Sequence, residues 1–249
     1  MKNGFRLYDA HTHAGIAAHS GRRCAPADLL REMDRCGVDR ALVIPFPVVD
    51  DMRAAHDLIG AAKRQHPDRF TGAACYTPAF SKESFRDEVR RCREVHDFRA
   101  VKLQPQYHGL NPFSPRSDFL FEAALEHKMA VVCHTGAGAP FALPSLLMVP
   151  ARRFPELNIV VAHCGGGIYF QEAVVAATFC PNLFLELSSL LPHQVLEVLT
   201  SVPSSRIMAG SDLLENTESE MGKILTLPIA DEDKRAILFS TAERVFGSC

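Results

Sequence analysis

The chain has 249 residues, of which 47% are hydrophobic and 22% are charged, and this suffices for one sizeable core but not for two full domains. Its net charge of −2 leaves no broad basic surface, so a nucleic-acid partner is not expected. No apolar run approaches the roughly 20 residues of a membrane span, and the opening residues lack the apolar segment of a secretory signal. The eight cysteines form no C-x-x-C pair, which is typical of reduced thiols and leads us to expect a cytoplasmic protein.

One pattern of alternating strands and helices runs along the whole chain. Short apolar runs predict strands that begin near residues 6, 41, 71, 100, 130, 158, 182 and 206. Amphipathic stretches lie between them, and the clearest predict helices over 26–37, 51–67 and 81–97. Eight such units predict a single-domain (β/α)₈ TIM barrel over residues 1–249, since these barrels usually have about 250 residues. An open doubly wound sheet is the alternative, but no glycine-rich dinucleotide fingerprint follows the first strand.

Polar side chains close several predicted strands, at the end where barrel enzymes carry their catalytic groups. Asp9, His11 and His13 end the first strand and share its parity, so we expect them to face the same side. The other residues that close strands or face inward are Lys102, His134, His163 and Asp212. A lone histidine at a strand end is usually a loop residue, but four imidazoles and a carboxylate together suit a divalent transition metal.

These residues resemble the motifs of the amidohydrolase superfamily, and most closely those of its amidohydrolase-related branch of metal-dependent hydrolases and non-oxidative decarboxylases. The similarity rests on D-x-H-x-H at 9–13, AVKLQP at 100–105, VVAHCGGG at 160–167, G-S-D at 210–212 and the closing helix at 235–247. It covers essentially the whole chain and implies a TIM barrel without a flanking β-sandwich. Leu213 and Thr241 depart from the branch's usual pattern, which bears on the subgroup and not on the ligands.

The resemblance implies a centre with one divalent metal ion, most often zinc, with Mn²⁺, Fe²⁺ or Ni²⁺ as alternatives. The implied ligands are His11, His13, His134 and Asp212. His163 would lie beside the metal and act on its bound water or on the substrate. In two-metal relatives a carbamylated lysine bridges the ions, and in that alternative Lys102 would be the bridge and His163 a further ligand.

We expect the protein to hydrolyse an amide, lactone or ester bond of a small molecule. A bound divalent metal lowers the pKa of its water toward ~7, Asp212 could take the proton of that water, and His163 could polarise the substrate carbonyl. Asp9 is expected to orient a ligand imidazole from behind. The residues expected to contact the substrate are Lys102, His108, Arg116 and Glu186, with Arg22 or Arg23 as a further carboxylate clamp.

Two other functions fit the same residues. The first is decarboxylation of a small aromatic or unsaturated carboxylic acid, although the loop at 14–25 is short for the decarboxylases of the branch. The second is a non-catalytic barrel that keeps a metal, although a structural zinc site is normally closed by four protein ligands. In each case the partner is a small molecule and not a membrane.

The remaining histidines and one apolar segment carry weaker expectations. The histidines on or at the ends of predicted helices, which we expect on solvated faces, are His56, His66, His96 and His127. For the loop histidines His19, His108 and His193, substrate contact and a plain loop position are both open. Apolar residues at 141–150 would suit the contact of a homodimer.

Overall fold

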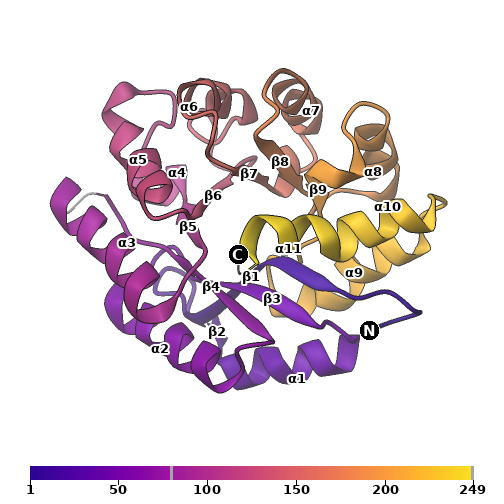
Figure 1. Cartoon of the computed structure of the whole chain (residues 1–249), viewed down its shortest axis with the longest axis horizontal. Helices are drawn as coiled ribbons and strands as arrows, with labels where there is room; N and C mark the ends of the chain where they lie inside the picture. The colour runs from indigo at the N-terminus through magenta and orange to yellow at the C-terminus, as the bar shows by residue number, and fades with distance from the viewer. Residues whose placement is uncertain (79–80, 248–249) are drawn as a thin grey trace.

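The computed structural model describes residues 1–78 and 81–247, and eight parallel strands form its centre (Figure 1). The strands, in chain order and in spatial order, are β1 (Tyr8–Ile16), β3 (Arg40–Pro45), β4 (Phe70–Ala74), β5 (Ala100–Leu103), β6 (Ala130–His134), β7 (Ile159–Ala162), β8 (Leu183–Glu186) and β9 (Ile207–Met208). A ninth, short strand, β2 (Arg23–Cys24), pairs antiparallel with the end of β1. All strands of the described residues belong to this one sheet, so none of them forms a separate β-sandwich.

Backbone hydrogen bonds close the sheet into a barrel. The amide of Ala10 donates to the carbonyl of Ala209 over 2.9 Å, and the amide of Asp212 donates to the carbonyl of His11 over 2.7 Å. Thr12 and Asp212 also form a parallel bridge. The first strand therefore meets the last one, and the predicted (β/α)₈ barrel is confirmed.

Helices surround the barrel on the outside (Figure 1). The helices are α1 (Pro26–Cys36), α2 (Met52–Gln65), α3 (Lys82–His96), α4 (Pro105–His108), α5 (Asp118–Glu126), α6 (Met148–Arg153), α7 (Phe170–Phe179), α8 (Pro192–Leu199), α9 (Thr217–Thr226), α10 (Asp231–Arg235) and α11 (Thr241–Phe246). Local signals explain their ends. Asp51 caps α2 by accepting from the amide of Ala54, and Gly37 ends α1 in the left-handed conformation that glycine adopts at low cost.

Short 3₁₀ and π turns connect or extend these elements. They are η1 (Pro115–Ser117), η2 (Pro144–Leu147), η3 (His163–Gly165), η4 (Ser204–Arg206), η5 (Leu214–Asn216) and the π-helical η6 (Ala236–Ser240). No helix among the described residues has both the length and the apolar character that a membrane crossing requires.

The inside of the barrel is packed at the end where the strands begin. Val132, Val160 and Met208 belong to one buried apolar cluster inside the ring of strands. Phe239 of η6 joins this cluster, and its ring lies 5.9 Å from that of Tyr8. Figure 1 shows the C-terminal helices lying across this end of the ring. Because the interior is filled by side chains at this end, the barrel is open at the opposite end, where the strands finish.

Two expectations about exposure are wrong. His56 and His96 were expected on solvated faces, but both are buried. Carboxylates on the facing helices satisfy their rings: His56 Nδ1 lies 2.7 Å from Glu88, and His96 Nε2 lies 2.9 Å from Asp57. Within the segment 141–150, only Phe141 is strongly exposed, so the apolar surface expected there for a homodimer is small.

Candidate metal centre

The two histidines of the first strand converge at the open end of the barrel. The pairing of β1 with β3 shifts register between Asp9 and Thr12. Tyr8 and Ala10 belong to the inner cluster, whereas His11 within the shift and His13 after it both face Asp212. The strict alternation expected through this motif is therefore broken, and the irregularity brings both imidazoles to one site.

Asp212 meets these imidazoles from the segment that follows the last strand, β9. Its Oδ1 lies 3.4 Å from His13 Nε2 and 3.7 Å from His11 Nε2. The residue has a positive φ of 64°, an uncommon conformation that asparagine and aspartate tolerate best. Although burial favours the neutral acid, the surrounding imidazoles of His13, His163 and His11 hold the pKa of Asp212 well below its usual value. Asp212 is therefore an anion beside two imidazoles.

The second nitrogen of each imidazole already has an acceptor. His11 Nδ1 lies 2.9 Å from Glu186 Oε2, and His13 Nδ1 lies 3.2 Å from the carbonyl of Pro45. Carboxylates and carbonyls only accept, so Nδ1 carries the proton in both rings. Each Nε2 then presents a lone pair toward Asp212. His11, His13 and Asp212, whose ligand atoms lie within 4.8 Å of one another, thus fit a divalent metal ion with nitrogen and oxygen ligands.

Glu186 is the buried acceptor that organises this centre. Besides His11, it accepts from the amide of His163 over 3.0 Å and from the hydroxyl of Ser188 over 2.9 Å. His163 Nδ1 lies 2.7 Å from the same hydroxyl. Since that hydroxyl gives its proton to Glu186, His163 Nδ1 must donate, which leaves its Nε2 as an acceptor. Glu186 is fully buried and does not line the cavity, so in this structure it positions the imidazoles, and its contact with substrate stays a prediction.

Asp9 has another role than the expected one. Its carboxylate accepts from the amide and the hydroxyl of Ser211 and from the backbone amide of His11. No imidazole contacts it among the hydrogen bonds of the described residues. Burial raises the pKa of Asp9 to about 7, against these hydrogen bonds. Asp9 therefore ties β1 to the segment before Asp212, while Glu186 orients the imidazole of His11.

Lys102 and His134 lie at the same site but outside this ligand group. Lys102 Nζ lies 2.9 Å from His11 Nε2, and burial lowers the pKa of this amine. His134 Nε2 lies 2.7 Å from the carbonyl of Ala137, and its ring lies 4.8 Å from that of His163. Burial lowers the pKa of His134 to about 4, so the ring is neutral and can be a ligand. Its place in the ligand set, and a carbamylated Lys102 between two ions, stay predictions.

A cavity of about 280 Å³ opens above these residues. Its lining residues are His13, His19, Ser20, Arg22, Phe46, Pro47, Lys102, Gln104, Tyr107, His134, His163, Asp212 and Leu213. Cationic and imidazole side chains outnumber Asp212, the one carboxylate among them. Arg22 also forms an ion pair with Glu215. The lining favours an anionic or strongly polarised small molecule.

Several expected substrate contacts lie elsewhere. His108 is buried, and its ring nitrogens face the amide of Gln104 and the carbonyl of Pro47. Arg116 is exposed in η1 and does not line the cavity. Neither side chain lines the cavity, because the chain after β5 turns into α4 and then η1, and their contact with substrate stays a prediction.

Sequence reasoning missed some residues of the cavity wall. Gln104 and Tyr107 line the cavity, and Gln104 Oε1 is buried without a hydrogen-bond partner in the described part of the chain. The signal for Gln104 was available, because it lies two residues after Lys102 at the end of the same strand. Phe46 also lines the cavity, with its ring stacked 5.2 Å from that of His13.

The chain matches a known protein family. A family model described as amidohydrolase matches residues 8–248, and the chain therefore belongs to the amidohydrolase family. None of the curated protein sequences matches it.

Solved structures share the fold at low sequence identity. The 5-carboxyvanillate decarboxylase of Sphingomonas paucimobilis is 17% identical, with a TM-score of 0.76, over 97% of this chain and 99% of that one. The 4-oxalomesaconate hydratase of Rhodopseudomonas palustris is 16% identical, with a TM-score of 0.77, over 96% and 95%. A 5-carboxyvanillate decarboxylase of Novosphingobium aromaticivorans, complexed with manganese and 4-hydroxy-3-methoxy-5-nitrobenzoic acid, is 15% identical, with a TM-score of 0.79, over 98% and 97%.

Proposed function

We propose that this protein is a metal-dependent hydrolase that cleaves an amide, lactone or ester bond in a small anionic molecule. The observation that carries the proposal is the fixed protonation of His11 and His13. Their Nδ1 atoms donate to Glu186 and to the carbonyl of Pro45, so both Nε2 lone pairs meet the carboxylate of Asp212 at the floor of a cavity. We also propose His134 as a further ligand.

A divalent ion at these ligands would supply a Lewis acid that makes a water molecule acidic enough to ionise near neutral pH. Zinc and manganese both suit two imidazoles and a carboxylate. Asp212, which stays ionised, holds the attacking water by accepting from it and can take its proton. His163, with an unprotonated Nε2, is a second proton acceptor, and this replaces the expected role of polarising the carbonyl.

Lys102 and Arg22 interact with the substrate through their positive charges. Lys102 lines the cavity as its most deeply buried cationic group, and a cation in such a water-poor place stabilises the negative charge that develops on the substrate oxygen. Arg22 at the cavity wall attracts the anionic group of the substrate, although its ion pair with Glu215 must then be shared.

Decarboxylation is the second candidate, because the same cationic lining would hold a carboxylate as the leaving group. The similar folds of two 5-carboxyvanillate decarboxylases support this candidate. The two reactions differ in their products: hydrolysis releases an acid with an amine or alcohol, whereas decarboxylation releases carbon dioxide.

The test is a product assay on the metal-loaded protein with panels of lactones, esters, amides and aromatic carboxylic acids. We expect hydrolysis products without carbon dioxide, and at least a 100-fold loss of turnover in Asp212→Asn, which keeps the shape but not the charge. Release of carbon dioxide would replace the first candidate by the second. Turnover that Asp212→Asn leaves unchanged would overturn the mechanism, and a metal-loaded protein with no turnover on any panel would favour the non-catalytic barrel.

A further inference from the structure

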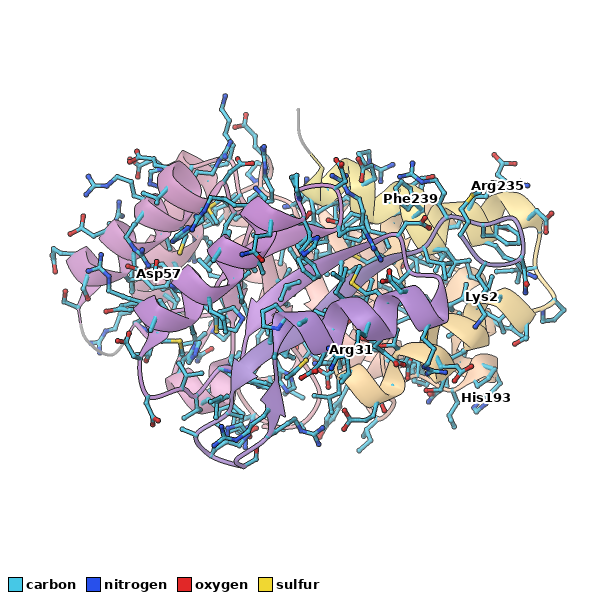
Figure 2. The ribbon with its side chains drawn as sticks, turned by 90° about the horizontal axis from the view of Figure 1, so that it is seen from below. Lys2, Arg31, Asp57, His193, Arg235 and Phe239 are labelled. Atoms are coloured by element: carbon cyan, nitrogen blue, oxygen red, sulfur yellow. The ribbon has the colours of Figure 1, made fainter. Side chains whose placement is uncertain are left out.

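A second cavity, of about 580 Å³, lies at the other end of the barrel. It is formed by the N-terminal segment before β1 and by the chain from α10 to α11. Its lining residues are Gly4, Phe5, Arg6, Arg235, Phe239, Ser240, Glu243 and Arg244. None of these lines the cavity above the metal centre. Figure 2 shows Phe239 and Arg235 together on the side of the molecule that carries the C-terminal helices.

The three arginines of this cavity are held in place by their neighbours. The guanidinium carbon of Arg6 lies 3.7 Å from the ring centroid of Phe239, and that of Arg235 lies 5.5 Å from the ring centroid of Phe5. Arg244 donates to the carbonyl of Ser205. Stacked and anchored guanidinium groups lose less freedom when they bind a ligand than free surface arginines do.

The positive charge of this cavity is poorly compensated. Glu243 is the one acidic side chain in its lining, and both its carboxylate oxygens lie within 2.8 Å of Arg40 Nη1. Arg235 faces Asp231 at 3.8 Å. Within residues 1–78 and 81–247, no carboxylate oxygen lies within ion-pair distance of Arg6 or Arg244. The cavity therefore presents guanidinium donors that lack a strong counter-ion.

We infer that this cavity binds a small aromatic carboxylate at a site separate from the metal centre. A guanidinium group pairs with a carboxylate through two parallel hydrogen bonds, which explains the preference for this anion. One face of the Arg6 guanidinium is covered by Phe239, and its other face can stack on a flat ring. A benzoate-sized molecule fits the volume of about 580 Å³.

The experiment titrates the folded full-length protein with benzoate and follows binding by calorimetry. The test variant is Arg6→Gln/Arg235→Gln/Arg244→Gln. The matched control is Arg31→Gln on α1, and Arg31, which Figure 2 labels, is an exposed arginine outside the cavity. We expect the triple variant to bind benzoate at least tenfold more weakly than the wild type and the control to bind it equally. Benzamide, which lacks the charge, and acetate, which lacks the ring, should each bind at least tenfold more weakly than benzoate.

Two results would overturn the inference. If the triple variant binds benzoate as tightly as the wild type, the ligand is held elsewhere, for instance above the metal centre. If benzamide or acetate binds as well as benzoate, the site does not recognise an aromatic carboxylate. Melting temperatures establish whether the variants are folded. If the triple variant is unfolded, the single variants Arg6→Gln and Arg244→Gln should each weaken benzoate binding at least threefold. Unchanged benzoate affinity in both single variants would count against the site.

Discussion

Two buried clusters of this protein contain the same kinds of side chain but differ in what their histidines can still bind. His11 and Glu186 belong to the cluster at the open end of the barrel, and His56 and Glu88 belong to a cluster between α2 and α3. In both, a carboxylate lies within 3 Å of an imidazole Nδ1. Both clusters could hold a metal ion by composition alone.

The two clusters differ in the partner of the second ring nitrogen, Nε2, of their histidine. His56 Nε2 accepts the backbone amide of Cys75 over 2.9 Å, so both nitrogens of that ring are used by the protein. His11 Nε2 instead lies near Asp212 and Lys102, below a cavity. Residues of metal-binding types that lie close together are therefore insufficient to make a metal site. The deciding feature is an imidazole lone pair that accepts no backbone amide. The cluster around His56 joins two helices to β4.

The largest expected difference is in metal content. His11→Ala should lower the bound divalent metal from one equivalent to nearly none, because one of the two imidazole ligands with fixed protonation is lost. His56→Ala should keep one equivalent, yet lose about 2–4 kcal/mol of unfolding free energy, because Glu88 and the Cys75 amide lose their partner. Elemental analysis after reconstitution and urea unfolding measure the two effects. Loss of metal in His56→Ala would show that the clusters are not distinct in this way.

A smaller effect is expected from the acceptor behind the ligand. Glu186→Gln keeps the volume but replaces the charged acceptor of His11 Nδ1, and such changes behind a ligand typically weaken metal affinity 10–100-fold. Competition with a chelating dye measures the affinity. Glu88→Gln, the equivalent change in the other cluster, is the control and should leave the metal affinity unchanged. Equal affinities for wild type and Glu186→Gln would remove Glu186 from its positioning role.

The smallest effect concerns acid stability. Burial disfavours the ionised form of Glu88, but hydrogen bonds from His56 and Arg91 lower its pKa from 4.5 to about 2. The folded pKa lies below the unfolded one, so this contribution to stability is complete above about pH 5 and is lost as the pH falls toward 2. Glu88→Gln should cost about 1–3 kcal/mol at pH 7, and its unfolding free energy should approach that of the wild type as the pH falls toward 2. A difference that stays constant from pH 7 to pH 3 would contradict this.

Much of the barrel was predictable from the sequence because local patterns carry it. The apolar runs near residues 41, 71, 100 and 130 fall at strands β3 to β6, and the helices over 26–37, 51–67 and 81–97 agree with α1 to α3 within two residues at each end. The predictions that failed concern side chains whose partners are distant in the sequence. His56 was assigned to solvent because Glu88, 32 residues away, could not be placed beside it.

Local sequence patterns account for the alternation of strands and helices and for the polar residues that close the strands, since hydrophobic periodicity and turn signals act over a few residues. The partners of those polar residues depend instead on contacts between distant segments of the folded chain. Glu186 became the acceptor behind His11, 175 residues away, and Asp9 became the tie to Ser211, 202 residues away. The reason is physical: a buried polar atom must find a partner, and barrel closure decides which atoms come within hydrogen-bond distance.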